Sequence, residues 1–97
     1  MLTIEEVSDN EVKLGGRFDA SQAEKATTAL SGYQTTIIID LSDLDYISSM
    51  GLSVLLQTYK RLNEKGEGLR LTNLNRHVRD VFKFTRLDQV FDIVDTD

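Results

Sequence analysis

The chain has 97 residues, of which 40% are hydrophobic and 28% are charged, and its formal net charge is −5. This length and composition predict one globular domain that spans residues 1–97. Since the chain has no cysteine and one histidine, disulfides, thiolate chemistry and cysteine-based metal sites are excluded, and we expect no metal and no cofactor. The negative charge argues against binding to nucleic acid or to an anionic membrane surface.

The sequence contains no apolar run near the roughly 20 residues that a bilayer-spanning helix needs. No signal peptide is visible at its start, and the absence of cysteine fits a reducing compartment. We therefore expect a cytoplasmic protein.

Two segments with alternating apolar residues open the chain. They cover Leu2–Val7 and Glu11–Leu14, and the turn-forming residues 8–10 lie between them, which predicts a β-hairpin. The glycine pair Gly15-Gly16 is predicted to end the second strand.

A helix and a buried strand are predicted next. The helix covers Ala20–Leu30, with Asp19 or Ser21 as its N-cap. The strand covers Thr35–Leu41, and its run of isoleucines favours a central strand that is covered on both faces. A polar loop is predicted over Asp40–Ser48.

Helices and strands alternate through the second half of the chain. We predict a helix from Ser49 or Met50 to Glu64, a strand over Leu69–Leu71, a helix over Arg76–Phe84 capped by Asn73 or Asn75, and a strand over Val90–Val94. This alternation favours parallel pairing with right-handed crossovers, whereas the hairpin adds an antiparallel pair. The predicted class is α/β, with a mixed sheet.

The segment Ser48-Ser49-Met50-Gly51 is the first candidate site, because it lies where the pattern becomes helical. Serine is a preferred helix N-cap, and this is one interpretation. The other is phosphorylation, since a phosphate at a helix start gains from the free N–H groups and the helix dipole, and would repel a docked partner. A nucleophilic serine would need a base, and the only histidine is His77, so we expect no catalytic residues.

Four aspartates, Asp19, Asp40, Asp43 and Asp45, form the second candidate site. Ligands of open α/β sheets bind at the carboxyl ends of the strands, where these residues are expected to lie. They are either turn and capping residues or an acidic rim that orients a hydroxyl or a Mg²⁺ ion, and their spacing does not require a metal.

Several motifs, taken with the order of the elements, resemble the STAS domain family of bacterial anti-sigma factor antagonists. The segment Gly16-Arg17-Phe18-Asp19 is similar to the family's G-x-L-D, and Ile37 to Leu44 is similar to its apolar strand followed by D-L. Tyr46 to Leu52 is similar to [FY]-[IM]-D-S-[ST]-G-L, and Phe84 to Phe91 to F-x-x-[ST]-G-L-x-x-[IVL]-F. The resemblance implies a four- to five-stranded mixed sheet with about three helices, packed mainly on one face.

The resemblance also implies a partner switch without enzymatic activity. In this family the unmodified antagonist binds an anti-sigma factor that is also a serine kinase of the histidine-kinase-like ATPase type. Phosphorylation of the first serine of D-S-[ST]-G releases the antagonist, and a serine phosphatase restores it. That serine is Ser49 here, with Ser48 as the less favoured target. The residues expected at the partner interface are Asp19, Asp43, Ser48, Met50, Gly51, Leu52, Ser53 and Gln57.

The chain departs from the family pattern in three ways. Ser48 replaces the usual Asp, and Met50 replaces the usual Ser or Thr. The chain ends soon after its last predicted strand, where the family commonly adds a helix, and this favours weak homodimerisation or a partner there.

Two other functions stay open on the sequence alone. One is a constitutive STAS-like subunit of a transport or signalling complex, without a phosphorylation switch. The other is a nucleotide-binding domain, against which the shortage of basic residues near the helix start counts.

Overall fold

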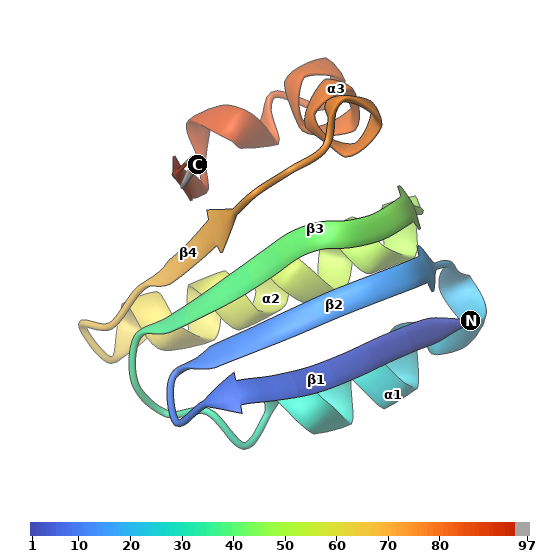
Figure 1. Ribbon diagram of the computed structural model, residues 1–97. Coiled ribbons are helices and arrows are strands. Elements are labelled where there is room, and N and C mark those ends of the chain that lie inside the picture. The colour runs from blue at the N-terminus through green and yellow to red at the C-terminus, as the bar shows by residue number, and fades with distance from the viewer. Residues whose placement is uncertain (95–97) are drawn as a thin grey trace.

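The computed structural model describes residues 1–94 and contains a sheet with helices beside it (Figure 1). In chain order the elements are β1 (Leu2–Ser8), β2 (Glu11–Phe18), α1 (Ala23–Leu30), β3 (Ile37–Ile47), α2 (Ser49–Glu64), β4 (Leu69–Thr72), α3 (Arg76–Phe84) and β5 (Asp92–Val94). Short 3-10 turns at Ala20–Gln22 and Leu87–Gln89 precede α1 and β5.

The five strands lie in the order β1-β2-β3-β4-β5. The β1–β2 hairpin is antiparallel, and each of the other neighbouring pairs is parallel, which confirms the predicted mixed sheet. Figure 1 shows α1 and α2 together behind the sheet, with α3 beyond β3 and β4. Phe91 connects α3 to the same core, because its ring lies 5.7 Å from that of Phe82 in α3 and 5.5 Å from that of Tyr59 in α2.

β2 is longer than predicted. It continues through Gly15 and Gly16 to Phe18, so the prediction that the glycines end this strand is wrong. Gly16 has φ +80°, and a Cβ there would lie 2.2 Å from the Met1 carbonyl oxygen. A glycine is therefore needed at this position, because the Met1 backbone lies directly against β2. The same Met1 carbonyl accepts a hydrogen bond of 3.0 Å from Arg17 N.

β3 is also longer than predicted. It starts at Ile37 and ends at Ile47, so the predicted polar loop over residues 40–48 is wrong. Along this stretch Leu41, Leu44 and Ile47 are buried at every third position. The reason is that the pairing with β2 shifts register twice, so the apolar period departs from the two-residue repeat of a regular strand.

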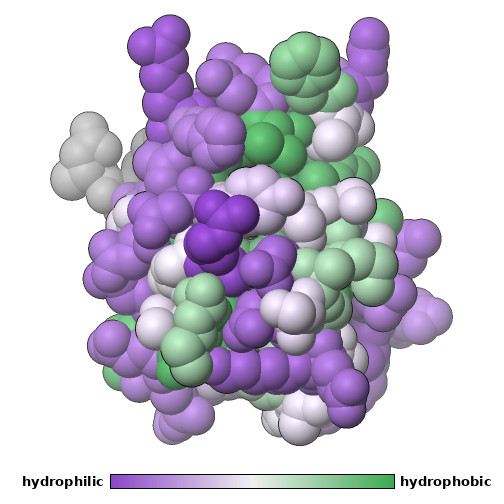
Figure 2. All heavy atoms as spheres, turned by 90° about the vertical axis from the view of Figure 1, so that its right-hand side faces the viewer, coloured by the Kyte–Doolittle hydropathy of each residue, from purple (hydrophilic) through white to green (hydrophobic). Residues whose placement is uncertain are grey.

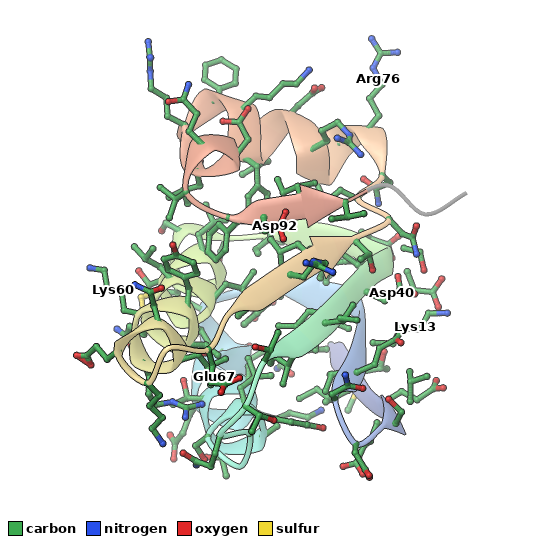
Figure 3. The ribbon with its side chains drawn as sticks, turned by 90° about the vertical axis from the view of Figure 1, so that its left-hand side faces the viewer. Lys13, Asp40, Lys60, Glu67, Arg76 and Asp92 are labelled. Atoms are coloured by element: carbon green, nitrogen blue, oxygen red, sulfur yellow. The ribbon has the colours of Figure 1, made fainter. Side chains whose placement is uncertain are left out.

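Within residues 1–94, helices cover only one face of the sheet, so the prediction that β3 is covered on both faces is wrong. On the other face Ile38 is only half-buried, and its neighbours are mainly charged. Figure 3 shows Lys13 and Asp40 on one side of the sheet and Lys60, which belongs to α2, on the other side. This open face carries an ion pair of 2.9 Å between Arg70 on β4 and Asp92 on β5.

The helices agree better with the sequence analysis. The predicted bounds of α2 and α3 are confirmed, and Asn75 is the N-cap of α3, where its side chain accepts a hydrogen bond from Val78 N. The helix predicted from Ala20 begins as a 3-10 turn and becomes α-helical only at Ala23. Within residues 1–94, no helix has the length and apolar character that crossing a membrane requires.

Candidate functional site

The candidate site is built where β2 and β3 end and α2 begins. Phe18 and Ile47, the last residues of the two strands, are paired in the sheet. Ser48 follows, and both its backbone N (2.9 Å) and its Oγ (3.1 Å) donate hydrogen bonds to the Phe18 carbonyl. Its Oγ also accepts a hydrogen bond of 3.1 Å from Gly51 N, so Ser48 is the N-cap that connects α2 to the sheet.

Gly51 and Leu52 support this junction from inside. A Cβ on Gly51 would lie 2.8 Å from Ile47 Cγ1 and 3.0 Å from Phe18 Cγ, so the first turn of α2 contacts the sheet through backbone. Leu52 is only 7% exposed. Both residues were expected at the partner interface, and the structure places them against the core, beneath the exposed residues of the same helix turn.

Ser49 lies at the surface of the same junction. It is the first residue of α2, it is exposed, and its hydroxyl makes no hydrogen bond to any residue among 1–94. The first turn of α2 carries no acidic side chain, so its free N–H groups and dipole are not already neutralised by a carboxylate. The neighbouring Met50 is 48% exposed.

The exposed surface continues along α2 through Ser53 and Gln57, which follow Ser49 at four-residue intervals and so lie on one side of the helix. We call Ser49, Met50, Ser53 and Gln57 the α2 surface. Figure 2 looks onto the end of the molecule where α2 begins and shows small hydrophobic areas separated by hydrophilic side chains.

The α2 surface borders a groove of about 180 Å³ between α1 and α2, which is lined by Gln57 together with Thr27 and Ser31. Arg61 holds its two walls together, because its guanidinium donates hydrogen bonds of 2.8 Å to Tyr33 O and 2.9 Å to Leu30 O. The sequence analysis missed this contribution of α1, since no periodicity within α1 indicates which helix will lie beside it.

Asp19 lies at the junction, because it directly follows Phe18. Its Oδ1 accepts hydrogen bonds from Ser21 Oγ (2.6 Å) and Ser21 N (3.1 Å). The hydrogen bond from the Ser21 hydroxyl is the main cause that lowers the pKa of Asp19. Desolvation raises this pKa, whereas the Ser21 backbone N–H, the N-terminal amino group and Arg17 lower it further. The site therefore has an ionised carboxylate near the start of α2.

Asp43 and Asp40 lie away from the junction. Asp43 is within β3 on the open face, where it forms an ion pair of 3.2 Å with Lys13 Nζ. The hydrogen bond and the charge of Asp43 raise the pKa of Lys13. Asp40 accepts a hydrogen bond of 2.8 Å from Ser42 N. The predicted acidic rim is thus divided, with Asp19 at the start of α2 and Asp43 on the sheet.

The two remaining candidate residues from the sequence analysis are both exposed. His77 is exposed in the first turn of α3, and Asp45 is exposed near the end of β3. Within the described residues, no three histidine, cysteine or acidic side chains are grouped in a way that could hold a metal ion.

Comparison with known proteins agrees with this arrangement. Residues 4–96 match the STAS domain family. The anti-sigma-B factor antagonist of Listeria monocytogenes is 30% identical over 87 residues, which cover 86% of this chain and 76% of that protein. The anti-sigma-B factor antagonist of Bacillus subtilis is 29% identical over 89 residues, which cover 89% of this chain and 82% of that protein.

Solved structures share the fold. The anti-sigma factor antagonist SpoIIAA in its unphosphorylated form superposes with a TM-score of 0.73 at 22% identity, covering 100% of this chain and 90% of that one. The phosphorylated form of SpoIIAA from Bacillus gives a TM-score of 0.74 at 24% identity, with coverage of 100% and 92%. Because the family match spans nearly the whole chain, this chain belongs to the STAS domain family.

Proposed function

We propose that this chain is a non-catalytic anti-sigma factor antagonist that acts as a phosphorylation-controlled partner switch. The proposal is supported by the names of its relatives, which are anti-sigma-B factor antagonists. In its unmodified state the chain binds an anti-sigma factor that is also a serine kinase of the histidine-kinase-like ATPase type. Phosphorylation of Ser49 releases it, and a serine phosphatase restores binding.

The observation that carries the proposal is the difference between the two adjacent serines. The Ser49 hydroxyl is exposed and makes no hydrogen bond within the described chain, so a kinase can reach it without breaking a contact. The Ser48 hydroxyl already donates to Phe18 O and accepts from Gly51 N. Phosphorylation of Ser48 would break the donated bond, so Ser49 is the better acceptor.

The mechanism is electrostatic and needs no unfolding. A phosphate on Ser49 adds about −1.5 to −2 charges at neutral pH, and the first turn of α2 stabilises them through its N–H groups and dipole. A partner docked on the α2 surface would leave these charges partly desolvated and unpaired. Such a penalty is worth a few kcal/mol, which corresponds to a loss of affinity on the order of 10²–10³.

Neighbouring residues have separate roles in this proposal. Met50 is an adaptable apolar contact on the α2 surface, and Gln57 extends that surface towards α1. Asp19 supplies the negative charge that the unmodified site presents to a complementary partner.

The test is intact-mass measurement and phosphosite mapping of the protein purified from its own cells, with and without phosphatase treatment. A phosphatase-sensitive gain of about 80 Da on Ser49 is expected, since the mechanism requires one phosphate. A single unmodified species under all growth conditions would contradict the switch. That result would favour a constitutive subunit, in which Ser48 acts only as a helix cap.

A further inference from the structure

The outer surface of α3 differs in charge from the rest of the molecule. Residues 76–86 carry four of the eleven basic residues of the chain but one of its sixteen acidic residues. Among them Arg76, Lys83 and Arg86 are exposed and form no ion pair with any residue among 1–94. Figure 3 shows Arg76 projecting away from the sheet. On a chain of net charge −5, this makes α3 a local basic surface.

Phe84 lies on this basic surface and is 90% exposed. The fold does not need it, because α3 packs on the core through the buried residues Val78 and Phe82. A protruding aromatic ring between charged side chains has the character of an interface anchor, which fills an apolar hollow while the charges around it pair with the partner.

A hollow of complementary character lies between the hairpin and the end of α1. Its volume is about 450 Å³, and its apolar lining includes Ile4, Val12 and Leu30. Glu6, Asp9 and Tyr33 form its polar part, and none of the residues lining it is basic. Burial raises the pKa of Tyr33, and the negative charges of Glu6 and Asp9 raise it further. We call this site the hairpin hollow.

We propose that the Phe84 ring and the basic side chains of α3 dock into the hairpin hollow of a second copy of this chain. Two α3 surfaces would repel each other, whereas α3 and the hairpin hollow have opposite charges. The volume of the hollow is sufficient for a phenyl ring above an apolar lining.

The position of the two surfaces makes this contact head-to-tail. In Figure 1, α3 lies at the top, beyond β3 and β4, whereas the hairpin turn and α1 lie towards the bottom, near β1, so α3 cannot reach the hairpin hollow of its own chain. A contact between two different surfaces leaves one of each unused, and it therefore propagates into short chains or a ring instead of closing at a dimer.

The contact leaves Ser49 accessible. Residues at the hairpin turn pair with the beginning of β3, whereas Ser49 follows its end. The 11 residues of β3 separate these two regions by about 30 Å at the usual rise of a strand. Self-association and the proposed Ser49 switch are therefore independent, and the failure of either would not affect the other.

Sedimentation equilibrium of the full chain tests the proposal. The average mass of the wild-type protein is expected to rise above 11.0 kDa as its concentration increases, and to fall again when salt screens the charges. Phe84→Ser is expected to weaken association about tenfold, a typical effect of losing an aromatic anchor. Val90→Ser is the matched control, because Val90 is also an exposed apolar residue, at 41%, but lies outside α3, and it should leave association unchanged.

Mixing two complementary variants tests the head-to-tail geometry. Phe84→Ser retains a working hollow, and the double variant Glu6→Lys/Asp9→Lys retains a working α3. At a concentration at which the wild type associates, each alone should be largely monomeric, whereas their equimolar mixture should form a dimer and nothing larger. Thermal melts followed by circular dichroism establish that all the variants are folded.

Three results would overturn the proposal. They are a wild-type protein that stays monomeric at every concentration, an association that Phe84→Ser does not weaken, and an association that stops at a dimer. The last result would indicate a closed two-fold contact through another surface.

Discussion

Ser48 and Ser49 are adjacent and chemically identical, yet the structure gives them opposite environments. The Ser48 hydroxyl is part of the hydrogen-bonded connection between α2 and β2. The Ser49 hydroxyl is exposed at the first position of the helix, with no partner among the described residues. Substitutions at the two positions should therefore affect different properties of the protein.

Substitution of Ser49 should change partner binding without changing stability. We expect Ser49→Asp to weaken binding to the kinase-type partner, because it places a negative charge in the interface, although it carries less charge than a phosphate. Ser49→Ala should bind as the wild type does and resist switching by kinase and ATP. Isothermal titration calorimetry with the cognate anti-sigma factor measures both.

The control for charge alone is Ser42→Asp, since Ser42 is exposed in β3 and is not part of the α2 surface. It should leave the affinity unchanged. If Ser49→Asp and Ser49→Ala bound equally well, the electrostatic mechanism would be wrong.

Substitution of Ser48 should change stability. Ser48→Ala removes the N-cap acceptor of Gly51 N and a donor to Phe18 O, so we expect the free energy of unfolding to fall by about 1–2 kcal/mol. Ser49→Ala is the matched control, and it should stay within about 0.5 kcal/mol of the wild type, as is usual for a surface site. Urea denaturation measures both, and equal effects at the two positions would contradict the assigned roles.

At the scale of elements, the close packing of α2 on the sheet depends on the absence of a side chain at Gly51. Gly51→Ala would place a Cβ 2.8 Å from Ile47 and 3.0 Å from Phe18, closer than carbon atoms normally approach. Because both neighbours are buried, we expect the free energy of unfolding to fall by about 1–3 kcal/mol, as in other overpacked cores.

Gly68→Ala provides the control for this substitution. The nearest atom to a Cβ on Gly68 is Thr36 Cγ2 at 4.0 Å, which is an ordinary contact. Urea denaturation of the two variants should therefore give clearly different midpoints. A Gly51→Ala variant as stable as Gly68→Ala would show that α2 shifts freely on the sheet.

The elements also show which patterns in the sequence are informative. The regular three- and four-residue spacing of apolar residues predicted α2 and α3 with their correct bounds. The polar residues of β3 predicted a loop instead of a strand, because its two register shifts interrupt the alternation. Such irregularities arise from pairing with β2, and so they have no signal within β3 itself.

At the scale of the whole molecule, two hydrogen-bonded carboxylates make the stability of the fold depend on pH. Glu67 accepts hydrogen bonds of 2.8 Å from both the N and the Oγ1 of Thr36, and these lower its pKa. The pKa of Asp19 is also lowered, chiefly by the Ser21 hydroxyl. Both groups bind protons more weakly in the folded chain than in the unfolded chain.

The sign of the pH dependence follows from these shifts. Their stabilising contributions are fully present above the unfolded pKa values of about 4, and they are lost as the pH falls through the lower folded values. We expect Glu67→Gln to flatten the decline of the free energy of unfolding below about pH 5, and Asp19→Asn to do the same at its own site.

Urea denaturation across the acidic range measures this effect. Glu64→Gln is the control, because the Glu64 carboxylate is exposed and makes no hydrogen bond to the described residues. Its pH profile should be parallel to that of the wild type. A Glu67→Gln profile that is also parallel would remove Glu67 from the acid response.

The sequence by itself determined the order of the elements, the mixed sheet, the family and the position of the serine pair at the start of α2. These features depend on local periodicity and short motifs, which neighbouring residues encode. Only the tertiary structure decided that Ser48 is engaged and Ser49 is exposed, because the partner of Ser48 is the carbonyl of Phe18, 30 residues away. Likewise, only packing separated Asp43 from Asp19 and buried Leu52, since each depends on contacts between strands and helices that are distant in the chain.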